Sequence, residues 1–136
     1  MTTTTLLRWS LSAGLAAHAA AMLVAPRLWY LHLPGVADTG PYNAHFVRDI
    51  GCAFLVAALG LAWRGWRPRD GWPAALAGAG FLLLHGGVHV AETLAGLCGW
   101  GALLRDAPLV LLPALLALAL ALPPRGHVTS AAAASS

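Results

Sequence analysis

Three side chains that could bind a metal ion lie close together in one apolar stretch, FLLLHGGVHVAE at 81–92. His85, His89 and Glu92 are separated by four and three residues, so a helix places them within about 60° of arc. Imidazole and carboxylate groups are ligands of zinc, copper and iron. They are costly to place in lipid, so they should face protein, water or an ion. The stretch predicts a polar site inside a membrane helix.

A second group of polar side chains begins another apolar run, in NAHFVRDIGC at 43–52. His45, Arg48, Asp49 and Cys52 are three or four residues apart, so they share one helix face. The structural alternative is an ion pair between Arg48 and Asp49 at the membrane surface. The chemical hypothesis is a shared shell in which His85 and His89 are the main cofactor ligands. The predicted metal ligands are His45, Asp49, His85, His89 and Glu92.

The composition is that of an integral membrane protein. Of the 136 residues, 59% are hydrophobic and only 10% are charged, whereas a soluble domain carries about 25% charged residues. The chain is too short for two domains. Its net charge of +3 is small and spread along the sequence, so it gives no support to nucleic-acid binding.

The apolar runs predict one all-α domain, an integral membrane four-helix bundle over residues 1–136. A polar C-terminal segment, 123–136, is expected to be a disordered tail. The first run is interpreted as a retained helix rather than a cleaved signal peptide, because three more follow it. The predicted spans lie at about 6–25, 44–63, 72–95 and 106–122.

The connections between these spans carry expectations of their own. Residues 27–46 are expected to form a long loop with aromatic anchors at the headgroup level. Residues 93–104 are expected to form an apolar, glycine-containing link in the membrane interface. Asp106 is a natural N-cap for the fourth helix, and Pro113 is expected to kink that helix.

An even number of spans puts both termini on one side of the membrane. Five arginines fall on that side and three on the other, which favours cytoplasmic N- and C-termini. The second helix then begins, and the third ends, at the periplasmic face, so the polar site should open there. Cys52 and Cys98 fall on the same side, where they could form a disulfide, bind copper or simply be buried thiols.

The stretches PGVADTGPYNAHFVRDIGCAFLVAALGLAW, FLLLHGGVHV and DAPLVLLPALLALAL resemble a group of small bacterial four-helix membrane proteins akin to the DoxX-like set. The resemblance covers about 6–123, and NAHFVRDIG is its most distinctive part. It implies a four-helix bundle in a bacterial inner membrane. DoxX-like proteins are variously linked to sulfur oxidation and redox partners, so the resemblance fixes no activity.

Three kinds of function suit this pattern. A transition metal (zinc, copper or iron) or a haem could bind the histidines and carboxylates, with Asp49 or Asp106 as a ligand or as its hydrogen-bonding partner, for redox chemistry or metal handling. The same groups could relay protons or hold a polar substrate without metal. The alternative is a small accessory subunit that packs against a larger respiratory, photosynthetic or transport complex, or against a second copy, within the lipid bilayer. Whether the protein is an enzyme stays open.

Overall fold

The computed structural model describes residues 1–123, which form α-helices, one short 3-10 helix and no strand. The predicted all-α class is therefore confirmed for this part of the chain. The predicted disordered tail at 123–136 lies, from residue 124 onward, outside the described residues. The elements are α1 (Thr3–Val24), α2 (Pro26–His32), the 3-10 helix η1 (Val36–Thr39), α3 (Ala44–Trp66), α4 (Trp72–Leu94), α5 (Trp100–Asp106) and α6 (Leu111–Ala121).

Two of these helices, α3 and α4, are each long and apolar enough to cross a membrane. The α1–α2 pair, bent by 114°, and the α5–α6 pair, bent by 48°, meet the same criterion when each is taken as one broken span. By length and composition, the described chain therefore has two membrane-spanning helices, or up to four. This helix content indicates a membrane protein.

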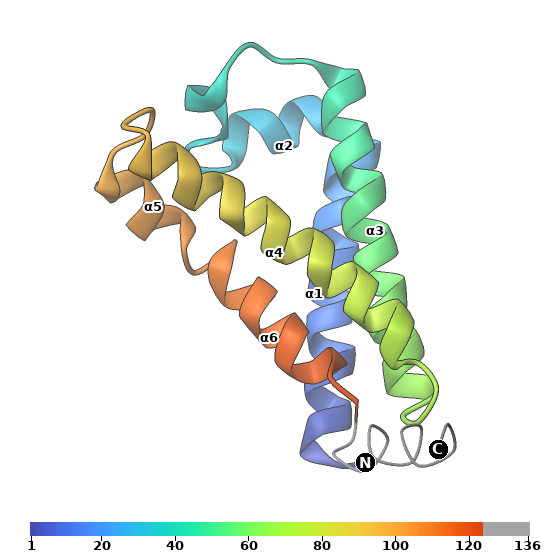
Figure 1. The fold of residues 1–136 in the computed structure, drawn as a ribbon. Helices are drawn as coiled ribbons and strands as arrows, with labels where there is room; N and C mark the ends of the chain where they lie inside the picture. Colours follow the sequence, from blue (N-terminus) through green and yellow to red (C-terminus); the bar gives the residue numbers. More distant parts are fainter. Residues whose placement is uncertain (124–136) are drawn as a thin grey trace, which may run out of the picture.

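The helices pack in the order α1, α3, α4, α6 (Figure 1), each against the next. Their interfaces are built from small residues. A methyl group added at Gly60 of α3 would lie 2.5 Å from the Ala74 carbonyl oxygen of α4, and one added at Gly78 would lie 2.7 Å from the Cα of Ala57. Without side chains at these positions, the α3 and α4 backbones approach closely, which is how helices associate in membranes.

Figure 1 shows the N-terminus, the turn between α3 and α4 and the last residues of α6 at one end of the bundle, which we call the N-terminal end. Two buried arginines close this end. Arg8 donates to the Leu120 carbonyl at 3.0 Å, and Arg64 donates to the Leu122 carbonyl at 2.8 Å. They satisfy carbonyl groups at the C-terminus of α6 that have no partner within that helix. The opposite end, which we call the pocket end, holds α2, η1 and α5.

The predicted fourth span, 106–122, is not one continuous helix. Asp106 is the last residue of α5, so its predicted role as the N-cap of the fourth helix is wrong. The break lies at Pro108, since proline removes a backbone donor and disfavours helical geometry in the preceding residue. Pro113, the predicted kink, sits in the first turn of α6, where proline is tolerated.

The connection predicted as a loop, 27–46, contains structure. Pro26 stops α1 and starts α2 from its first position, and the chain turns by 114° there. η1 then leads into α3, which is capped by Asn43: its side-chain oxygen accepts from the backbone N–H groups of His45 and Phe46. The predicted link 93–104 likewise contains the last residues of α4 and most of α5. These short elements build the pocket end.

Candidate functional site

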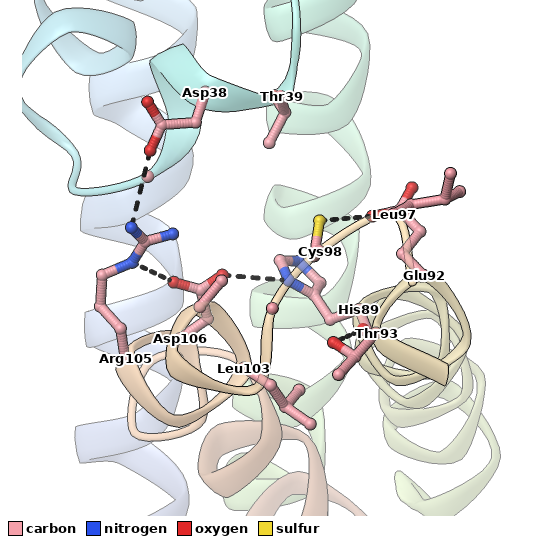
Figure 2. A pocket seen from close by; sticks show the side chains of 13 residues that line it. Asp38, Thr39, His89, Glu92, Thr93, Leu97, Cys98, Leu103, Arg105 and Asp106 are labelled. Atoms are coloured by element: carbon pink, nitrogen blue, oxygen red, sulfur yellow. Dashed lines mark hydrogen bonds and ion pairs between the residues drawn. The ribbon is translucent and has the colours of Figure 1, made fainter. Parts of the chain in front are cut away.

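A pocket of about 240 Å³ opens at the pocket end of the bundle. Figure 2 shows it from close by. Three segments line it: η1 with the turn before it, the C-terminal end of α4 with the link that follows, and α5. Each segment contributes at least one ionisable side chain. Its charged and titratable lining residues are Asp38, His89, Glu92, Cys98, Arg105 and Asp106.

A chain of contacts between charged or titratable side chains joins these segments (Figure 2). Arg105 lies between two carboxylates, 3.6 Å from Asp38 and 2.9 Å from Asp106. The other carboxylate oxygen of Asp106 lies 3.3 Å from Nδ1 of His89. The side chains of His89 and Asp106 are only 25% and 18% exposed. Asp106 thus contacts one imidazole nitrogen, Nδ1. It does not engage Nε2, an arrangement that is common in histidines whose other nitrogen binds a ligand.

The end of α4 explains how Glu92 and Cys98 reach the pocket. Gly96 adopts a left-handed conformation with φ of 73°, and the backbone N–H groups of Leu97 and Cys98 donate to the Glu92 carbonyl at 2.9 and 3.3 Å. This glycine-dependent helix ending reverses the chain. It brings the Cys98 thiol 4.0 Å from the carboxylate of Glu92, to which it donates.

The position of Arg105 depends on a glycine in the facing turn. Gly35 has a φ of 84°, and a methyl group added there would collide with the Arg105 guanidinium. The Arg105 side chain donates a hydrogen bond to Asp106 at 2.9 Å. An arginine side chain is always charged, so this guanidinium ties α5 to η1 through Asp38.

The pocket is acidic although the protein is basic. It holds three of the five carboxylates of the sequence, Asp38, Glu92 and Asp106, but only one of its eight arginines. With His89 neutral, the lining side chains sum to −2. The pocket therefore attracts cations, whereas the chain as a whole carries a formal charge of +3.

The predicted ligand His85 lies deeper in the bundle, among aromatic rings. Its ring centroid is 5.1 Å from that of His89, 5.6 Å from Phe54 and 6.0 Å from Phe81. Phe54 also contacts His18 of α1, with centroids 4.9 Å apart. His85 thus connects the pocket to an aromatic cluster between α1, α3 and α4.

The predicted ligands His45 and Asp49 pair with each other instead of joining the pocket. They are 3.4 Å apart on α3, and their side chains are 88% and 59% exposed. Neither lines the pocket. Arg48 donates to the Leu23 carbonyl at 3.2 Å, in place of the predicted pairing with Asp49.

The five predicted ligands are therefore divided among three places. His89 and Glu92 line the pocket, His85 lies below it, and the other two are on the outside of α3. Over residues 1–123, no three His, Cys, Asp or Glu side chains are placed to hold one metal ion. Cys52 and Cys98 are both free thiols, so the considered disulfide is not formed. The donor set as arranged does not fit a metal held by these five residues.

Asp38 was not predicted as a site residue from the sequence. Cys98 was considered only for a disulfide, for copper binding or as a buried thiol, and Arg105 was predicted to lie on the same side as the polar site without a role in it. Asp38 follows Pro34-Gly35, a dipeptide that marks a turn in the sequence. This turn is the signal that could have drawn attention to the polar segment after it. Asp106 was considered as a ligand or as the partner of one, and the structure pairs it with His89.

No family model, curated protein or solved structure matches the chain. The resemblance to DoxX-like proteins therefore stays a hypothesis.

Proposed function

We propose that this chain is a multi-pass protein of the bacterial inner membrane that binds a small organic cation in a pocket at the periplasmic face. The observation that carries the proposal is the partly buried pair of His89 and Asp106, 3.3 Å apart, in a pocket with two further carboxylates. A protonated amine offers both the positive charge and the hydrogen-bond donors that these oxygens accept.

The rest of the pocket also suits an amine with a short carbon chain. Its lining includes Leu97 and Leu103 beside the charged groups, so apolar and acidic surfaces face the same volume. Small-molecule sites commonly combine an apolar wall with a few polar groups that fix orientation. Arg105 lies between Asp38 and Asp106, and it holds these carboxylates in position rather than occupying the pocket.

The membrane arrangement is part of the same proposal. Four spans, with α1–α2 and α5–α6 each forming one broken span, bring both chain ends to the cytoplasmic side. The basic turn between α3 and α4 supports this orientation, since short cytoplasmic loops are enriched in arginine. The pocket then opens to the periplasm.

A matched pair of ligands tests the proposal. Putrescine and 1,4-butanediol have the same carbon chain, but the diol carries hydroxyl groups in place of the two ammonium groups. The purified protein should bind putrescine and should bind the diol at least tenfold more weakly. The reason is that a hydrogen bond to a charged group is stronger than one between neutral groups. Isothermal titration calorimetry in detergent gives both affinities. Equal affinities would show that charge does not decide binding.

The two histidine–aspartate pairs provide matched protein variants. Asp106→Asn should weaken putrescine binding by about 10- to 100-fold, because it removes a carboxylate from the pocket. Asp49→Asn removes the same group from the exposed pair on α3 and should leave the affinity unchanged. An equal loss in both variants would assign the effect to total charge and contradict a local site.

Metal handling is the second candidate, on one specific observation. A metal-bound histidine usually has a carboxylate on its other ring nitrogen, as His89 has Asp106, and Glu92 and Cys98 line the same pocket. A bound molecule or a second copy would have to supply further ligands. Titration with Zn²⁺ and Cu²⁺ in the same calorimeter tests this: tight, stoichiometric binding of either ion that Asp106→Asn weakens would favour it over the amine.

Haem has less support, because His85 and His89 lie one turn apart on the same helix and cannot face an iron from opposite sides. The accessory-subunit hypothesis is the outcome if neither amines nor metals bind. The protein would then be expected to co-purify with a larger membrane complex from gently solubilised membranes.

A further inference from the structure

The turn at residues 67–71 joins α3 and α4, the two helices that are each long enough to cross a membrane. It therefore lies at a membrane surface whichever way the protein is oriented. Arg67 and Arg69 are both exposed in this turn. With Trp66, Pro68 and Asp70 they border a shallow hollow of about 350 Å³. Positive charge is thus concentrated where lipid headgroups lie.

Buried positive charge lies next to this turn. Arg64 is 2% exposed and donates to the carbonyl oxygens of Pro68 and Leu122. Arg8 is 9% exposed and donates to the Leu120 carbonyl. Within residues 1–123, neither arginine is paired with a carboxylate. Arg64 thus fixes the shape of the turn, and both guanidinium groups add to its positive field.

Two tryptophans set the depth of the turn in the membrane. Trp63 and Trp66 are 44% and 64% exposed, and their ring centroids are 5.3 Å apart. The Arg67 guanidinium lies over the Trp66 ring, 5.3 Å from its centroid. Indole rings collect at the level of lipid headgroups, so Arg67 is held at the depth of the lipid phosphates.

We propose that this turn is a binding site for the phosphate headgroup of an anionic phospholipid. Arg67 and Arg69 contact the phosphate, and the two tryptophans contact the upper acyl chain and the glycerol region. The described residues at this end include four arginines and a single carboxylate, Asp70. Their net positive charge complements an anionic lipid. The site lies at the end of the bundle opposite the pocket, and it does not depend on what the pocket binds.

Lipid retention tests the proposal. The protein is purified in detergent, titrated with phosphatidylglycerol or phosphatidylcholine and examined by native mass spectrometry. Wild-type protein should retain phosphatidylglycerol in preference to phosphatidylcholine. The double variant Arg67→Gln/Arg69→Gln should bind phosphatidylglycerol about thirtyfold more weakly, since each arginine near a membrane surface changes binding about fivefold.

A control variant removes the same charge from the other end of the bundle. Arg27→Gln/Arg48→Gln changes two exposed arginines outside the turn, and it should keep the preference for phosphatidylglycerol. An equal loss in both double variants would overturn the proposal, because net charge would then explain the preference. Inorganic phosphate, at the same concentration as the lipid, should not displace phosphatidylglycerol from the protein. Displacement by phosphate alone would also overturn the proposal, in favour of a site for a free anion.

A measurement on the unmodified protein covers the case in which a variant does not fold. Phosphatidylglycerol should raise the unfolding temperature of the wild type more than phosphatidylcholine does, because a ligand that binds the folded state stabilises it. Equal shifts with the two lipids would contradict an anionic-headgroup site.

Discussion

At the scale of single residues, the two histidine–aspartate pairs of this protein differ in what surrounds them. His45 and Asp49 are one turn apart on α3 and largely exposed, whereas His89 and Asp106 come from different helices and are mostly covered. Exposed ion pairs contribute little to stability because water screens them. The covered pair fixes the relative position of α4 and α5, so we expect it to matter both for structure and for binding.

The conformation of Gly35 gives the first prediction at this scale. Gly35→Ala should lower the free energy of unfolding by about 1–2 kcal/mol, because alanine is strained in the left-handed backbone conformation of this position. Collision of the added methyl group with Arg105 should lower it further. Gly96→Ala is the matched control, because Gly96 has a similar φ of 73° and nothing within 4 Å of an added methyl group. Denaturation in detergent measures both variants. An equal loss of stability would show that the Arg105 contact contributes nothing.

The sequence predicted single-helix geometry better than contacts between helices. The spacing of His85 and His89 is local, and their rings do lie side by side, 5.1 Å apart. The predicted five-ligand site also needed His45 and Asp49 to face His85 and His89, which depends on how α3 is rotated about its own axis. That helix is apolar on most of its surface, so its sequence does not show which face is buried. The buried face follows the small residues Gly51, Ala57 and Gly60 instead.

At the scale of elements, α3 and α4 were predicted well, at 44–63 and 72–95, because their starts are marked by sequence. Asn43 caps the first, and Pro73 occupies the first turn of the second. The helices α2 and α5 were missed. Each has only seven residues, so the helical spacing of apolar residues cannot be recognised in the sequence. Helices this short also depend on tertiary packing for their stability.

The close packing of α3 on α4 predicts opposite effects for two glycines of one helix. Gly80→Ala should raise the free energy of unfolding by up to about 1 kcal/mol, because alanine favours helix more than glycine and the added methyl group meets nothing within 4 Å. Gly78→Ala should lower it by about 1–3 kcal/mol, because the methyl group meets the Ala57 backbone at 2.7 Å. Thermal unfolding in detergent measures both. A gain at both positions would mean that the helices pack less closely here.

At the scale of the whole molecule, charge is divided between the two ends. The N-terminal end combines four described arginines with Asp70, and the pocket end combines Arg27, Arg48 and Arg105 with four carboxylates. The described ends therefore carry +3 and −1, with histidines neutral. Arginines rather than carboxylates bias membrane orientation, and the described ends carry four and three arginines. This difference, together with the shortness of the basic turn, is the basis for proposing that the N-terminal end faces the cytoplasm.

Cysteine labelling in intact bacterial cells tests the orientation. In a background of Cys52→Ala and Cys98→Ala, Thr39→Cys at the pocket end should react with a membrane-impermeant maleimide. Asp70→Cys in the basic turn should react only after the cells are lysed. Both original residues are exposed, so accessibility within the protein does not limit labelling. The reverse pattern would place the pocket in the cytoplasm, and labelling of both in intact cells would contradict a membrane-spanning arrangement.

The break at Pro108 has a consequence for the surrounding lipid. Helices α1, α3 and α4 have 22 or 23 residues, about 33–35 Å of helix, whereas α6 has 11, about 16 Å. The hydrocarbon core of a bilayer is about 30 Å thick. In the proposed arrangement α6 crosses the membrane together with α5, and the 48° bend between them makes this span shorter from end to end than a straight helix of the same residues. The side of the bundle formed by α5 and α6 would then match a thinner bilayer than the side formed by α3 and α4, and lipids with short acyl chains would be expected to gather along it.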